Sequence, residues 1–107
     1  MIRTAVFAAA ALTLVALAGT ASAASFNCYA AKSHTEAVIC DNQRLSDLDT
    51  QMSISYFSLL NSLHGYQRQR LQNDQVRWLG WRNGCQANIG CLFRVYNQRI
   101  SRLNGGY

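Results

Sequence analysis

The chain contains no proline, and this absence is what most limits the folds open to it. Proline interrupts helices and glycine weakens them, so a proline-free chain with few interior glycines can form long helices. Apolar residues recur at every third or fourth position between Leu45 and Leu63 and again between Leu92 and Leu103. This spacing is typical of amphipathic helices. The sequence therefore predicts an all-α fold.

Local signals divide the chain into four helical stretches. The capping-box pattern Ser33-x-x-Glu36 predicts the start of a short helix. His64-Gly65 is a suitable helix end, because glycine readily adopts the left-handed conformation of a C-cap, and Asn83-Gly84 has the composition of a turn. We expect a small antiparallel helical bundle of three to four helices: a short one after Ser33, and longer ones over about 45–64, 67–82 and 92–103.

Residues 1–23 have the composition of a secretory signal peptide. A single positive charge is followed by an uncharged run rich in Ala, Leu and Val over residues 5–18, and Ala21-Ser22-Ala23 forms an A-x-A end. The run is about 14 residues long, whereas a membrane span needs roughly 20, which argues against a transmembrane anchor. We expect cleavage after residue 23, with Ala24 as the nearby alternative, and export of residues 24–107 as one periplasmic or secreted domain without a membrane span.

The four cysteines lie in the exported domain, where an oxidising compartment favours disulfides. Four cysteines permit three connectivities. Cys28 and Cys40 are 12 positions apart and Cys85 and Cys91 are 6 apart, at opposite ends of the domain. This favours the local disulfides Cys28–Cys40 and Cys85–Cys91, which would cross-link the bundle at both ends. A zinc site is the alternative, but the spacings do not match the usual C-x2–4-C ligand pairs, and we expect no metal.

Few side chains offer the chemistry of an active site. The histidines His34 and His64 fall at predicted helix ends, and the capping role of Glu36 explains that residue without catalysis. Asp47 and Asp49 are two positions apart on a helix, so their side chains do not face each other. The sequence has no Gly-rich phosphate loop and no metal-ligand cluster. We expect no enzymatic activity and no cofactor.

Charge is distributed unevenly along the domain. Residues 24–65 hold two basic and four acidic side chains, a net charge of −2, whereas residues 66–107 hold seven arginines and one aspartate, a net charge of +6. The basic half is either a solvated surface with local ion pairs or a docking face for an anionic partner such as nucleic acid, anionic lipid or an acidic cleft. Arg99 falls within the apolar stripe of the last predicted helix, where we expect it either to extend its charged end to solvent or to meet an acidic residue such as Asp49.

The two tryptophans of the third predicted helix have different expected roles. The inner side of this helix is formed by Leu71, Gln75, Trp78, Leu79 and Arg82. Trp78 is therefore expected in the core, whereas Trp81 is displaced by about 60° from the centre of the stripe and is expected to be partly exposed. An exposed tryptophan beside arginine is a common interface anchor. The predicted partner-binding residues, close to the Cys85–Cys91 loop, are Trp81, Arg77, Arg82 and Arg94.

These residues, taken together, resemble the LprI-type lysozyme inhibitor family, formerly a domain of unknown function. The matching motifs are Cys28-x7-Glu36-x2-Ile39-Cys40, Leu45-x2-Leu48-Asp49, Tyr56, Gln75-x2-Trp78-Leu79, Arg82-Asn83-x-Cys85, Cys91-Leu92, Tyr96, Arg99-Ile100 and Leu103. The resemblance covers nearly the whole exported domain and implies a small secreted or periplasmic α-helical protein with two disulfides. It also implies lysozyme as a partner, because some members of this family are reported to inhibit lysozyme.

Two features depart from the family pattern. The founding inhibitor is a lipoprotein, whereas no lipid-acceptor cysteine follows the predicted cleavage site here. The exported domain is also basic, as animal lysozymes are, so long-range electrostatic attraction would be poor. Short-range contact with the two carboxylates of the lysozyme cleft is still open to an arginine or a tight loop. We therefore expect an exported lysozyme inhibitor that protects peptidoglycan. The alternatives are a binding module for an anionic envelope component or nucleic acid, and a structural or stress-response envelope protein.

Overall fold

The computed structural model describes residues 24–105. The predicted signal peptide, residues 1–23, lies outside the described residues. The elements, in chain order, are a short 3-10 helix η2 (Cys28–Ala30) and the α-helices α1 (His34–Asp41), α2 (Gln43–Ser62), α3 (Gly65–Gly84) and α4 (Ile89–Asn104). Residues 24–105 contain no strand, and the predicted all-α fold with four helices is confirmed.

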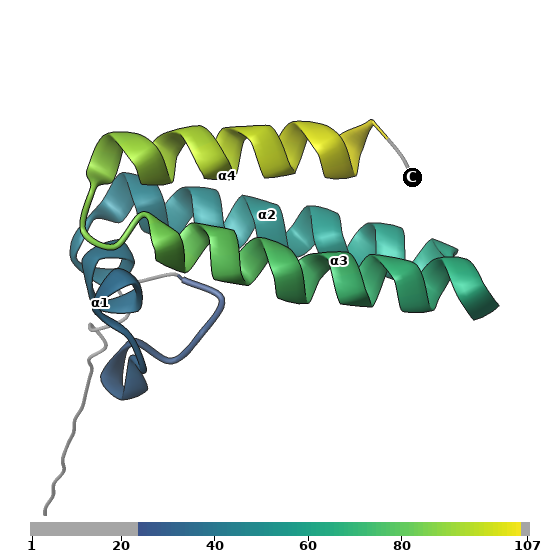
Figure 1. The fold of residues 1–107 in the computed structure, drawn as a ribbon, viewed down its shortest axis with the longest axis horizontal. Coiled ribbons are helices and arrows are strands. Elements are labelled where there is room, and N and C mark those ends of the chain that lie inside the picture. The colour runs from purple at the N-terminus through teal and green to yellow at the C-terminus, as the bar shows by residue number, and fades with distance from the viewer. Residues whose placement is uncertain (1–23, 106–107) are drawn as a thin grey trace, which may run out of the picture.

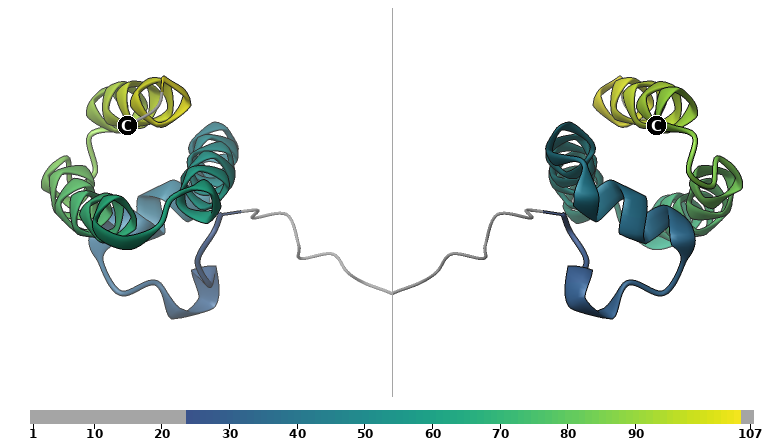
Figure 2. Two further views of the ribbon diagram at one scale, coloured as in Figure 1. Left: turned by 90° about the vertical axis from the view of Figure 1, so that its right-hand side faces the viewer. Right: turned by 90° about the vertical axis from the view of Figure 1, so that its left-hand side faces the viewer.

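The three long helices lie side by side, and each runs antiparallel to the next one in the chain (Figure 1). Viewed along their length they form the corners of a triangle, and α1 crosses one end between α2 and α3 (Figure 2). α4 packs more extensively on α2 than on α3. None of the helices in the described part of the chain is long and apolar enough to span a membrane. The side of α4 that faces α3 is therefore more open than the side that faces α2.

Side-chain caps set most of the helix starts. Ser33 accepts a hydrogen bond from the amide of Glu36 at 3.1 Å, as the capping box predicts. Asn42 and Asn88 cap α2 and α4 in the same way. Gly65 has the expected left-handed φ, 58°, but its predicted role as the C-cap of α2 is wrong: α2 ends at Ser62 with Leu63 as its C-cap, and Gly65 is the first residue of α3. The sequence therefore specifies most of the helix starts locally.

The end of α3 differs from the prediction. The turn expected at Asn83-Gly84 is still helical, and the left-handed residue is Gln86, with a φ of 53°. The side-chain oxygen of Asn83 accepts hydrogen bonds from Nε and Nη2 of Arg82 at 3.1 and 2.9 Å. Because that oxygen is bound to Arg82, it does not cap a turn, and α3 continues to Gly84.

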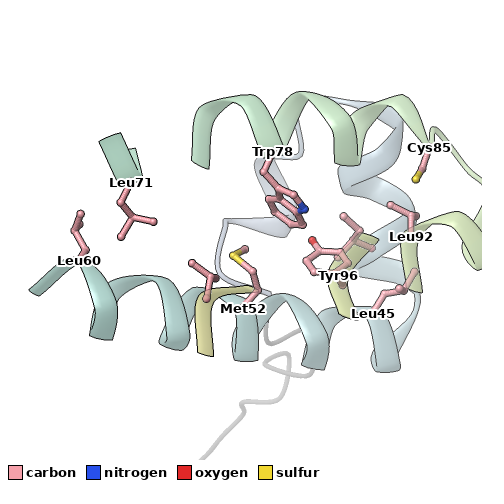
Figure 3. Close-up of a cluster of buried hydrophobic side chains, with 10 residues drawn as sticks. Leu45, Met52, Leu60, Leu71, Trp78, Cys85, Leu92 and Tyr96 are labelled. Carbon is pink, nitrogen blue, oxygen red and sulfur yellow. The ribbon is translucent and has the colours of Figure 1, made fainter. Parts of the chain in front are cut away.

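The core runs along the axis of the bundle. It consists of Ile39, Leu45, Met52, Leu60, Leu71, Trp78, Cys85, Leu92, Tyr96 and Leu103 (Figure 3). The predicted core position of Trp78 is confirmed, and its ring meets that of Tyr96 edge to face with 5.2 Å between the centroids. This pair joins α3 to α4 near the middle of the bundle.

Both predicted disulfides, Cys28–Cys40 and Cys85–Cys91, are confirmed. The expectation that they cross-link opposite ends of the bundle is wrong. α1 lies at the same end as the α3–α4 loop (Figure 1), and the Thr35 hydroxyl on α1 donates a hydrogen bond to the carbonyl of Asn83 at 3.1 Å. Both disulfides therefore stiffen one end, whereas the α2–α3 turn at the other end has no covalent cross-link.

Removing either disulfide should lower stability by an amount that depends on the loop it closes. Replacing Cys28 and Cys40 with alanine should lower the free energy of unfolding by about 3 kcal/mol, and replacing Cys85 and Cys91 by about 2.4 kcal/mol, because the second loop is shorter. Urea unfolding of the two double variants measures both values. Unchanged stability of either variant would contradict the prediction.

Candidate functional site: a ridge and a groove formed by α3 and α4

The structure separates the four predicted partner-binding residues. Trp81 is 70% exposed, as predicted, and Arg77 and Arg94 are also exposed. Arg82 is only 3% exposed, so its assignment to a binding surface is wrong. It follows Trp78 by one helical turn on the inner side of α3, and it lies between buried Asp49 and partly buried Glu36, which neutralise it. The exposed candidates are thus Trp81, Arg77 and Arg94.

Five exposed residues form a continuous ridge on the outer side of α3. They are Tyr66, Arg70, Asn73, Arg77 and Trp81, and they are called the α3 ridge below. Their spacings of three or four residues place them on one face of the helix. At 1.5 Å per residue, the ridge is about 22 Å long from end to end. An aromatic side chain therefore stands at each end of the ridge, with two arginines between them.

A groove of about 310 Å³ lies beside the ridge, between α3 and α4. Its walls are formed by Asp74, Arg77, Trp78 and Trp81 of α3 and by Val95, Gln98, Arg99 and Arg102 of α4. Arg77 and Trp81 belong to both the groove and the α3 ridge. The groove exists because α4 packs more extensively on α2 and leaves its side toward α3 partly open. The ridge and the groove form one surface.

Two arginines of this surface, Arg77 and Arg99, are held by neighbouring side chains. Arg77 forms an ion pair with Asp74 one turn earlier on α3. Arg99 donates from Nε and Nη2 to the side-chain oxygen of Gln75 at 3.1 and 2.8 Å, and its guanidinium lies 6.0 Å from the centroid of the Trp78 ring. These contacts orient the guanidinium groups before any partner binds, which lowers the entropy lost on binding.

Asp49 is paired with other residues than the sequence predicted. The expected contact between Arg99 and Asp49 is wrong, because Tyr96 occupies that position: its hydroxyl donates to Oδ1 of Asp49 at 2.6 Å. Tyr96 precedes Arg99 by about one turn on the inner side of α4. Nη1 of Arg82 lies 3.8 Å from the same oxygen, and Nη2 lies 3.4 Å from Glu36. Arg82 thus bridges two carboxylates from α1 and α2 beneath the α3–α4 surface.

Tyr96 should remain protonated at any ordinary pH. Burial, and then the neighbouring Asp49 carboxylate, raise the pKa of Tyr96 well above its usual value of 10.0. The phenol therefore stays a hydrogen-bond donor to Asp49, which has no exposed surface. This hydrogen bond lies in the interior, beneath the α3–α4 surface, and joins α4 to α2.

Replacing Tyr96 with phenylalanine should lower the free energy of unfolding by about 1–3 kcal/mol at pH 7, because buried Asp49 loses a hydrogen-bond donor.

The wild-type protein should also lose stability as the pH rises above 10.0, because tyrosine in the unfolded chain releases its proton there while buried Tyr96 keeps it. Urea unfolding at pH 7 and over an alkaline series tests both statements. An equally steep alkaline loss in Tyr96→Phe would contradict the second.

Among the residues of this surface, sequence reasoning missed Tyr66, Arg70 and Asn73 on α3 and Gln98 and Arg102 on α4. The helical spacing that joins Tyr66 to Trp81 was available as a signal, whereas the α4 residues depend on how α4 packs. Within residues 24–105, no group of three or more His, Cys, Asp or Glu side chains could hold a metal ion.

Comparison of the chain with protein-family models, with curated proteins and with solved structures finds no match. The resemblance to the LprI-type family rests on the sequence motifs alone. The geometry of the α3–α4 surface is the second source of information about function.

Proposed function

We propose that this protein is an exported inhibitor of lysozyme that blocks the substrate cleft and so protects peptidoglycan. The observation that carries the proposal is the α3 ridge, where Trp81 is 70% exposed next to Arg77 on a rigid helix. Exposed tryptophan and arginine dominate the binding energy of many protein interfaces. The motif resemblance to the LprI-type family supplies the identity of the partner.

The shape and chemistry of the α3 ridge suit an enzyme cleft. Lysozyme binds an extended polysaccharide and carries two catalytic carboxylates in its cleft. The α3 ridge, about 22 Å long, can lie along such a cleft. The guanidinium group of Arg70 can bind a carboxylate through two parallel hydrogen bonds, and Arg77 can do so by exchanging Asp74 for the new partner. Trp81 would then fill an apolar sugar site. Occupation of the cleft excludes substrate without any chemical step.

The charge of the two proteins makes a distinct prediction about salt. The exported domain carries a net charge of +4, from −2 before residue 66 and +6 after it, so it repels a cationic lysozyme at long range. Salt screens that repulsion as well as the short-range attraction between arginine and carboxylate. Inhibition should therefore persist at moderate ionic strength.

A lysis assay tests the proposal. Oxidised protein is mixed with an animal lysozyme, the mixture is added to a cell-wall suspension, and the fall in turbidity is followed at low and at moderate salt. We expect the rate of lysis to fall in proportion to the amount of added protein. Lysis should stop once the protein is in molar excess over lysozyme. Undiminished lysis at a several-fold molar excess would contradict the proposal. A sample without lysozyme controls for direct effects on the suspension.

Binding of an anionic envelope component is a second candidate function, favoured by the exposed arginines Arg70, Arg77, Arg94 and Arg102 on α3 and α4. Binding to a polyanion releases counterions and weakens steeply with salt. Retention on a polyanion matrix that disappears at modest salt, together with undiminished lysis by lysozyme, would favour this function over inhibition.

A further inference from the structure

The first described residues contact the interior of the protein. Ala24 and Phe26 are partly buried and pack on the core cluster. The amide and the hydroxyl of Ser25 both donate to Oδ2 of Asp49, at 2.7 and 2.5 Å. The guanidinium of Arg82 lies 5.6 Å from the centroid of the Phe26 ring. The segment that directly follows the predicted cleavage site is therefore held in place by three separate sets of contacts.

Asp49 lies in surroundings that are short of positive charge. It has no exposed surface. The groups that face it are the Tyr96 hydroxyl from α4, Ser25 from the N-terminal segment, and Arg82 from α3 at 3.8 Å. Arg82 also serves Glu36 of α1 at 3.4 Å. One guanidinium thus neutralises two carboxylates, and a buried carboxylate is strongly stabilised by a cation of its own.

We infer that the α-ammonium group released at Ala24 by removal of the signal peptide is the second cation for Asp49. In this step an exported peptidase uses water to hydrolyse the peptide bond between Ala23 and Ala24. The new carboxylate leaves with the leader, and the new amine of Ala24 takes up a proton. The inference rests on the predicted cleavage and on these contacts, and it is independent of the proposed function.

The position of the new charge follows from backbone geometry. The nitrogens of adjacent residues are at most about 3.7 Å apart, and the Ser25 nitrogen is 2.7 Å from Oδ2 of Asp49. The Ala24 ammonium is therefore at most about 6.4 Å from the carboxylate, and any bend of the backbone brings it into the range of about 4–6 Å over which opposite charges stabilise each other. Processing would thus complete the buried ion network and stabilise the mature fold over its precursor.

The pH dependence has a definite sign. An α-amino group ordinarily has a pKa of about 7.7–8.0. Asp49 raises the pKa of this group, the positive charge of Arg82 opposes part of that rise, and Tyr96 stays neutral. The stabilisation is therefore fully present below about pH 7.7 and is lost as the pH rises through the higher pKa of the folded state.

The test compares three forms of the oxidised domain: one that begins at Ala24, one that begins at Ala24 with an acetylated amine, and one that begins at Ala23. Calorimetry at pH 6.5 should give the free Ala24 form a melting temperature about 4–8 °C above the acetylated form. The form that begins at Ala23 has the same charge one residue further away and should lose most of this gain. The difference should shrink at pH 9.5. Equal melting temperatures of all three forms would overturn the inference.

Two further measurements separate the ion pair from a general effect of the N-terminus. In the Asp49→Asn background, acetylation should no longer change the melting temperature; an undiminished effect would overturn the inference. If that variant does not fold, an NMR titration of the Ala24 amine in the wild-type domain replaces it. A pKa above about 8 is expected, and a pKa within or below the ordinary range would count against the pair.

The mass of the exported protein identifies the cleavage site. The intact mass should correspond to a first residue of Ala24, or of Ser25 if the neighbouring bond is cut. Either start keeps the charged nitrogen within reach of Asp49. A start that retains the leader or removes Ser25 would overturn the inference.

Discussion

Replacing Arg82 with methionine should lower the free energy of unfolding by about 3–5 kcal/mol. Arg82 is 3% exposed and lies 3.4 Å from Glu36 and 3.8 Å from Asp49. Without it, fully buried Asp49 and partly buried Glu36 have no guanidinium beside them. Methionine retains much of the side-chain volume, so the loss reports on charge more than on packing. Urea unfolding at pH 7 measures it.

Arg94 provides a matched control for this experiment. It is exposed on α4, and its replacement by methionine removes the same charge from the same basic half of the chain. Surface substitutions of this kind usually change stability by no more than about 0.5 kcal/mol. Similar losses in the two variants would mean that Arg82 contributes only to net charge, and would contradict the account of the buried network.

Replacing Trp81 with alanine should weaken lysozyme binding by about 30-fold or more, which corresponds to at least about 2 kcal/mol of binding free energy. Trp81 is 70% exposed and is one of the two aromatic side chains of the α3 ridge. The melting temperature should stay nearly constant, because little of this side chain packs on the core. Calorimetric titration and thermal unfolding of the same samples give the two quantities.

Val76 offers a control on the same helix. It is also 70% exposed but lies away from the α3 ridge. Val76→Ala should leave both the affinity and the melting temperature unchanged. An equal loss of affinity in the two variants would show that exposure on α3, and not position on the ridge, determines binding. A large fall in the melting temperature of Trp81→Ala would assign that residue to the core.

The elements of this fold were predictable because their signals are local. The spacing of apolar residues identified the long helices, and Ser33 with Glu36 marked the start of α1. The short separations of Cys28 from Cys40 and of Cys85 from Cys91 favoured the observed disulfides. Each of these inferences depends only on residues that are close together in the sequence, within about the length of one helix. The same reasoning separated buried Trp78 from exposed Trp81.

The buried ion network was not predictable, because it joins distant parts of the chain. Arg82 meets Glu36 across 46 positions, and Tyr96 meets Asp49 across 47. Helical spacing placed Arg82 on the inner side of α3, yet its charge led to a surface assignment. The helical periodicity predicted the position of Arg82 correctly, because acidic groups from α1 and α2 lie close enough to pair with its guanidinium. The partners could not be identified before the helices were placed.

The location of the candidate site was only partly predictable for the same reason. Trp81 and Arg77 followed from the pattern of α3 alone. The groove beside them depends on α4 lying closer to α2 than to α3, and Gln98 and Arg102 line it only because of that packing. The folding of α1 across the end that carries the α3–α4 loop is another property of packing, which is why the two disulfides share one end.

Competition for the lysozyme cleft tests the central claim most directly. Oxidised protein is titrated calorimetrically into lysozyme alone and into lysozyme saturated with a chito-oligosaccharide that fills the cleft. If the α3 ridge occupies the cleft, the apparent affinity should fall at least tenfold in the presence of the oligosaccharide. Binding of equal strength in both titrations, or no binding to lysozyme alone, would contradict the claim.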